Sequence, residues 1–112
     1  MIEAEIFSQI GGARFGIFNA TWPFAKINVS PNKIELKCFL KTYQFEKDKI
    51  IRLREYNGII SKGLLIEHNL KDYPHHVVFW SLKFERLKNR LKNFGYLVNI
   101  PKKSDAWYKG RP

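Results

Sequence analysis

Apolar residues recur at every second position through most of the first eighty residues, and this alternation is what most constrains the fold. The clearest example is the pair of segments 26–29 and 34–38, which lie on either side of a turn at 30–33. Alternation of period two is typical of strands that bury one face against a core. Since Gly, Pro and Asn interrupt the pattern at short intervals, the sequence predicts a series of antiparallel hairpins.

The alternation predicts about six or seven short strands. They are expected at 14–18, 26–29, 34–38, 43–45, 51–56, 59–68 and 75–80. Residues 1–13 form an N-terminal segment without a clear pattern. In the strand at 51–56, Ile51 and Leu53 are expected on one face, opposite the two arginines, and Glu55 is a further candidate for that face.

Two short segments carry turn signals. Asn57-Gly58 predicts a type I′ hairpin turn, because both residues tolerate the positive φ that this turn requires. Thr21-Trp22-Pro23-Phe24 predicts an irregular connection, because proline fixes its own φ and lacks an amide donor.

The spacing changes after residue 80 and predicts one amphipathic helix. Phe84, Leu87, Leu91 and Phe94 follow one another at three, four and three residues, which places them on one face of a helix. Ser81 is the expected N-cap and Gly95 stands where a C′ residue belongs. Residues 96–100 are expected to return to the core as an extended segment.

A chain of 112 residues has room for one core, so residues 1–100 are expected to form a single domain, followed by a basic tail at 101–112. The fold class expected is mainly β (β+α), an antiparallel barrel or sandwich closed by one C-terminal α-helix. Cys38 is the only cysteine, which favours a reducing, cytoplasmic location without disulfides. It alternates with Ile34 and Leu36 on an apolar face, where a buried thiol is expected to be inert.

The order of these elements resembles the pleckstrin-homology-like (PH-like) domains of small bacterial proteins, over residues 14–98. The segments that carry the resemblance are FAKINV (24–29) with IEL (34–36), YQFEKDKI (43–50), GLLIEH (63–68) and VVFW (77–80). The resemblance implies a barrel closed by the helix, which serves as a scaffold for phosphoinositide, peptide or subunit binding. The loop at 30–33 carries few basic residues compared with the lipid-binding members of that family.

Catalytic and metal-binding signatures are not evident in the sequence. His75 and His76 are adjacent in an expected strand, so their side chains point to opposite faces, and His68 could join only one of them. Nucleophile, metalloprotease and phosphate-loop patterns are lacking. We therefore expect a non-enzymatic module with no cofactor and no metal.

The net charge of +10 is concentrated near the C-terminus. Residues 1–80 carry 11 basic and 8 acidic side chains, whereas residues 81–112 carry 9 basic and 2 acidic ones. An anionic-surface site is expected at Lys83, Arg86, Lys88, Arg90, Lys92, Lys102 and Lys103. Trp107 and Tyr108 are candidate interfacial anchors, or they dock on their own domain. The same charges could instead form a solvated face that keeps the protein soluble.

The sequence is compatible with three binding functions. Contact with an anionic membrane surface, at the inner face of the cell membrane, is the first. Non-specific nucleic-acid binding is an alternative, because basic residues and exposed aromatic rings suit phosphates and bases. A protein-interaction module, including a homo-oligomer that packs aromatics such as Trp22 and Phe24, is the third. No stretch is long and apolar enough to predict a transmembrane helix.

Overall fold

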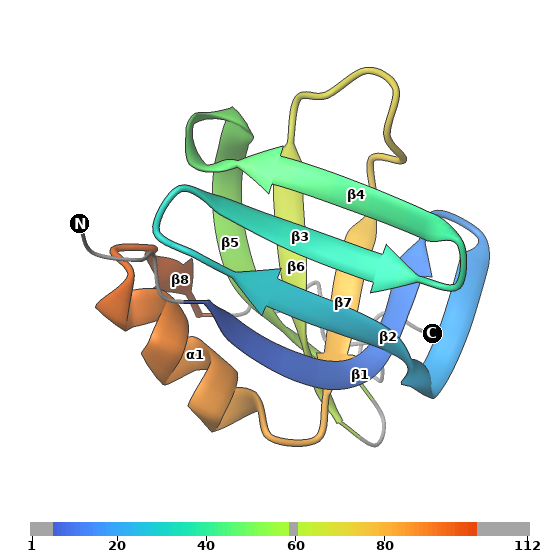
Figure 1. Ribbon diagram of the computed structural model, residues 1–112, viewed down its shortest axis with the longest axis horizontal. Coiled ribbons are helices and arrows are strands. Elements are labelled where there is room, and N and C mark those ends of the chain that lie inside the picture. Colours follow the sequence, from blue (N-terminus) through green and yellow to red (C-terminus); the bar gives the residue numbers. More distant parts are fainter. Residues whose placement is uncertain (1–5, 59–60, 101–112) are drawn as a thin grey trace.

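The computed structural model describes residues 6–58 and 61–100, which form one curled sheet of eight strands, a half-barrel, with a single α-helix (Figure 1). The strand order across the sheet is β4-β3-β2-β1-β7-β6-β5-β8. In chain order the elements are β1 (Phe7–Phe15), β2 (Phe18–Val29), β3 (Lys33–Cys38), β4 (Lys41–Glu46), the 3₁₀ helix η1 (Lys47–Lys49), β5 (Ile50–Asn57), β6 (Lys62–His68), β7 (Val77–Ser81), α1 (Phe84–Asn93) and β8 (Val98–Asn99). The mainly β class with one helix is confirmed, whereas the number of strands is higher than expected.

The first strand begins earlier than the sequence predicts. Strand β1 starts at Phe7, and the segment expected as a strand at 14–18 is the end of β1, a turn and the start of β2. Gly11 and Gly12 lie inside β1, where neighbouring strands approach closely. A Cβ on Gly11 would clash with the carbonyl oxygen of Trp80 in β7.

The hairpin predicted at 26–38 is confirmed. Val29 of β2 pairs with Ile34 of β3, and the amide of Ser30 donates to the carbonyl of Lys33 over 3.0 Å. The irregularity predicted at 21–24 is real, but it is a bulge within β2 and not a connection between strands. Gly11 pairs with Ala25 and Ala13 with Ala20, so β2 carries three more residues than β1 over this stretch.

Two details of the β5–β6 hairpin differ from the prediction. Asn57 pairs with Lys62 and the amide of Gly58 donates to the carbonyl of Ser61 over 3.1 Å, so the pairing continues through the positions expected to form the turn; positions 59–60 are outside the described residues. Ile51 is 58% exposed because β5 bulges between Ile50 and Arg52 and turns this side chain away from the core. Leu53 and Glu55 are buried, as expected.

The last strand was not predicted as part of the sheet. Val98 and Asn99 form β8, which pairs parallel with Leu53 and Arg54 of β5 and makes the sheet mixed instead of purely antiparallel. Two residues are too few for a period to be visible, which is why the sequence indicated only an extended segment.

The core lies between the inner face of the curled sheet and the helix. Leu87 and Leu91 of α1 are fully buried, and Phe84 nearly so, whereas Phe94 is half-buried. The sheet contributes Ile27, Val29, Ile34, Leu36, Phe45, Leu64, Ile66 and Phe79. Cys38 is buried on the same face, and burial raises the pKa of its thiol, which fits the inert role expected of it.

The two ends of α1 differ in how well they were predicted. The N-cap is Lys83, not Ser81, because Ser81 is still the last residue of β7. The Ser81 hydroxyl nevertheless accepts the amide of Lys83 over 3.0 Å and donates to Gln9 over 2.5 Å. Gly95 is at C′ with φ +90°, as predicted.

A Schellman motif closes the helix and docks the following residue. The amide of Gly95 donates to the carbonyl of Lys92 over 3.0 Å, and that of Tyr96 to Leu91 over 2.9 Å. The Tyr96 ring is buried, its hydroxyl donates to the carbonyl of Ser30 over 2.9 Å, and burial raises the pKa of Tyr96 to about 12. The helix end is thereby tied to the β2–β3 turn.

Replacing Gly95 with alanine should destabilise the fold by about 1–2 kcal/mol, the usual cost of a left-handed conformation in a residue with a Cβ. The new Cβ would also lie 2.9 Å from Nζ of Lys47. Urea unfolding measures the effect, with the exposed helical residue Asn93→Ala as the matched control. Equal midpoints for Gly95→Ala and wild type would contradict the C′ role.

Tyr96 should make the protein less stable at high pH. Because the folded state raises the pKa of Tyr96 from 10 to about 12, its contribution is complete below pH 10 and is lost as the pH rises through about 12. Thermal unfolding of wild type and Tyr96→Phe between pH 8 and pH 12 tests this. The wild-type melting temperature should fall more steeply above pH 10, and parallel curves would show that Tyr96 is not responsible.

Candidate functional site

The basic helix face predicted from the sequence is partly engaged within the domain. Nζ of Lys88 lies 3.6 Å from Oε1 of the buried Glu55, and the Arg90 guanidinium lies 5.3 Å from the ring centres of both Phe7 and Phe94. These two cations hold α1 against the sheet. Lys83, Arg86 and Lys92 are exposed.

Glu55 connects the helix to the sheet. Besides Lys88, it binds Lys62 of β6 with an Oε2–Nζ distance of 2.8 Å. This hydrogen bond and the charge of Glu55 raise the pKa of Lys62. The other predicted site residues, Lys102, Lys103, Trp107 and Tyr108, lie outside the described residues.

Two hairpin tips gather apolar side chains at one end of the half-barrel. Phe15 pairs with Phe18 around the two-residue turn Gly16-Ile17, and Cys38 pairs with Lys41 around Phe39-Leu40. Figure 1 shows both tips at the right of the view, away from α1 at the left. Ile17 and Leu40 are 102% and 101% exposed, so these side chains protrude fully.

Phe39 lies at the centre of this surface. Its ring packs edge-on against Phe18 at 6.2 Å and stacks on Phe24 at 5.8 Å, yet the side chain is 65% exposed. We call Ile17, Phe18, Phe24, Phe39 and Leu40 the apolar end. Of these residues, only Phe24 was expected from the sequence to contribute to an interaction surface.

Backbone geometry at Phe39 adds to the case that the apolar end is functional. Phe39 has φ +55°, in the region that bulky residues avoid, whereas the other tip places Gly16 there with φ +63°. Two-residue hairpin turns favour Gly, Asn or Asp at such positions. A Phe-Leu turn is therefore locally unfavourable. No signal in the sequence marks this turn, because two apolar residues in succession look like a continuing strand.

The surroundings of the apolar end are basic. Arg14 precedes one tip, and Lys37 and Lys41 flank the other. No acidic residue occurs between Glu5 and Glu35, or between Glu35 and Glu46. Glu35 itself accepts hydrogen bonds from the amides of Asn28 and Gln44, and the Asn28 bond contributes most to lowering its pKa.

A second surface is a groove on the outer face of β1. Two hollows of about 840 and 520 Å³ lie next to each other there, and Trp22 and Leu82 line both. We call this the β1 groove. Its lining includes Ile10, Gly12 and Arg14 of β1, Asn19, Thr21, Trp22 and Lys26 of β2, Tyr56, Trp80, Leu82, Lys83 and Arg86.

Trp80 forms one wall of the β1 groove because glycines leave room for its indole. It pairs with Gly12 on one side and Gly63 on the other. A Cβ on Gly63 would lie 2.8 Å from Cε3 of the indole, and one on Gly58 2.6 Å from Cζ3. The centre of the Tyr56 ring lies 5.8 Å from the centre of the Trp80 ring.

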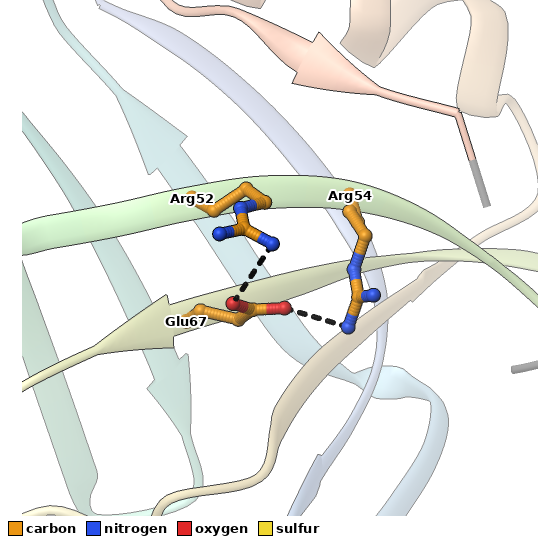
Figure 2. A network of polar contacts seen from close by, with 3 residues as sticks. All are labelled: Arg52, Arg54 and Glu67. Atoms are coloured by element: carbon orange, nitrogen blue, oxygen red, sulfur yellow. Dashed lines mark ion pairs between the residues drawn. The ribbon is translucent and has the colours of Figure 1, made fainter. Parts of the chain in front are cut away.

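The outer face of β5 and β6 is electrostatically different from the groove. Figure 2 shows Glu67 between two arginines, with an ion pair of 2.6 Å to Arg54 and one of 3.9 Å to Arg52. The cations of this part of the sheet thus have a carboxylate partner. Those that line the β1 groove have no acidic neighbour among its described lining residues.

His68 and His76 contact other residues of the domain. His68 is buried, and Nδ1 accepts the amide of Leu70 over 3.1 Å, so Nε2 carries the proton and donates to the carbonyl of Pro74 over 2.8 Å. His76 packs against Tyr56 at 5.8 Å. Residues 6–58 and 61–100 contain no group of three His, Cys, Asp or Glu side chains placed to hold a metal ion.

Comparison with known proteins adds no further constraint: no family model matches the chain, and no curated protein matches its sequence. Within the described residues, no helix has the length and apolar character needed to cross a membrane.

Proposed function

We propose that this protein is a non-enzymatic module that binds an anionic membrane surface by inserting its apolar end. The observation that carries the proposal is the pair of protruding tips with Ile17, Phe39 and Leu40, which are flanked in the sequence by Arg14, Lys37 and Lys41. Single side chains that protrude fully suit a bilayer interface, because lipid closes around them. A flat protein partner would leave gaps between the tips.

The two contributions are of similar size and neither is sufficient alone. Four cations near anionic lipid, such as Arg14, Lys26, Lys37 and Lys41, contribute about 4 kcal/mol. Insertion of three large apolar side chains contributes a further ~4 kcal/mol, at the lower end of the range for their burial. The sum of about 8 kcal/mol corresponds to micromolar binding.

This arrangement changes the expected role of the helix. Since α1 and the two tips lie at opposite ends of Figure 1, a flat membrane that receives the apolar end does not reach the cations of α1. We propose the apolar end as the primary contact. Lys83, Arg86 and Lys92, together with Lys102 and Lys103, stay a second candidate for electrostatic contact.

We also propose that the chain is a PH-like domain and works at the inner face of the cell membrane. The curled sheet followed by one helix supports the first part. The absence of cysteine pairs supports the second, because Cys38 is the only cysteine. Anionic lipids are concentrated on the cytoplasmic leaflet, which matches the charge of the protein.

Replacing Leu40 with serine should weaken binding to phosphatidylserine-containing vesicles about tenfold, since about 1.5 kcal/mol of apolar insertion is lost. Flotation with these vesicles measures it. The matched control is Leu97→Ser, a leucine that is 79% exposed near the end of α1. Equal losses for both variants, or none for Leu40→Ser, would rule out the apolar end as the contact.

The variant Phe39→Gly should separate binding from stability. Glycine relieves a backbone cost of about 1–2 kcal/mol, which offsets the lost ring contacts with Phe18 and Phe24. We expect the urea midpoint to change by less than about 1 kcal/mol in free energy while vesicle binding falls about tenfold. Unchanged binding would show that Phe39 does not enter the membrane.

A further inference from the structure

The β1 groove has the charge of a polyanion site. Arg14, Lys26, Lys83 and Arg86 line it from three directions, β1, β2 and the start of α1. Within the described part of the chain no Asp or Glu lines either hollow. The Arg14 guanidinium donates from Nε to the carbonyl of Gly16 over 3.1 Å. A ligand with repeated negative charge is complementary to this lining.

The groove also offers aromatic faces. Trp80 and Tyr56 are half-buried neighbours on the outer face, and Trp22 is 55% exposed on the β2 bulge opposite them. Cations together with accessible aromatic rings are the combination that binds single-stranded nucleic acid, in which phosphates meet the cations and bases stack on the rings. A peptide made of acidic residues alone would use the cations but has no flat rings to stack on Trp80.

The extent of the groove favours a flexible strand over a small molecule. The two hollows are neighbours that share Trp22 and Leu82, with Arg14 lining one and Arg86 lining the other. Each hollow thus has at least one cation, and the ring of Trp22 is shared by both. Such a pair of hollows suits several successive nucleotides, within the range of about 4–16 that single-strand sites occupy.

We propose that the β1 groove binds single-stranded nucleic acid without sequence preference. Arg14, Lys26, Lys83 and Arg86 contact phosphates, and Trp22 and Trp80 stack on bases. The groove shares Arg14, Ile17 and Lys26 with the proposed membrane contact, whereas Trp80, Lys83 and Arg86 belong to the groove alone.

Fluorescence polarisation with a labelled oligothymidylate of ~10 nucleotides tests the proposal on the full chain. Affinity should fall with salt with a log-log slope of about −3, the value for four phosphate contacts on a single strand. Trp80→Ala should weaken binding roughly ten- to a hundredfold, the usual effect of removing a stacking ring. Because Trp80 is half-buried, the exposed Trp22→Ala and Lys26→Ala provide variants that should fold normally.

The controls separate the competing outcomes. Lys71→Ala removes an exposed lysine outside the groove and should leave affinity unchanged, and Leu40→Ser should bind the oligonucleotide as wild type does. Equal losses for Lys26→Ala and Lys71→Ala, salt-independent binding or preference for duplex would overturn the proposal. Competition by a polyglutamate peptide as strong as by unlabelled oligonucleotide would assign the groove to acidic peptides instead.

Discussion

The close approach of strands around Gly11 and Gly12 is the constraint on which the rest of the structure depends. Strand β1 pairs with β2 on one side and with β7 on the other, so it joins the two halves of the sheet. A Cβ on Gly12 would lie 2.7 Å from the carbonyl of Ala20, and one on Gly11 closer still to that of Trp80. Only glycine permits both contacts, and these contacts let the sheet curl around the residues that α1 buries.

Both candidate surfaces follow from that geometry. The curl brings the β1–β2 and β3–β4 tips to the same end of the half-barrel, where Phe18 and Phe24 reach Phe39. On the outer face, the glycine positions beside Trp80 leave its indole accessible. The middle of β1 carries no side chains at Gly11 and Gly12. The groove beside it is lined by cations and aromatic rings.

Sequence alone predicted the parts whose local signal agrees with the fold. The alternation in β2 and β3, the helical stripe of Leu87 and Leu91, and Gly95 at C′ all have this property. The predictions from the sequence were wrong where tertiary contacts override local signals. The Gly-Gly pair lies within a strand, and Asn57 pairs with Lys62 instead of forming a two-residue turn. Exposure of the Phe39-Leu40 tip could not be predicted, because an apolar turn looks like a continuing strand.

The central functional claim is that the two hairpin tips face the bilayer while the sheet keeps its fold. Solution NMR of the protein bound to anionic bicelles that contain a paramagnetic lipid measures this directly, because amides near the lipid lose intensity. The largest losses of amide signal intensity are expected at residues 16–18 and 39–40, with the signals of α1 nearly unaffected. Losses that are largest along α1 would contradict it.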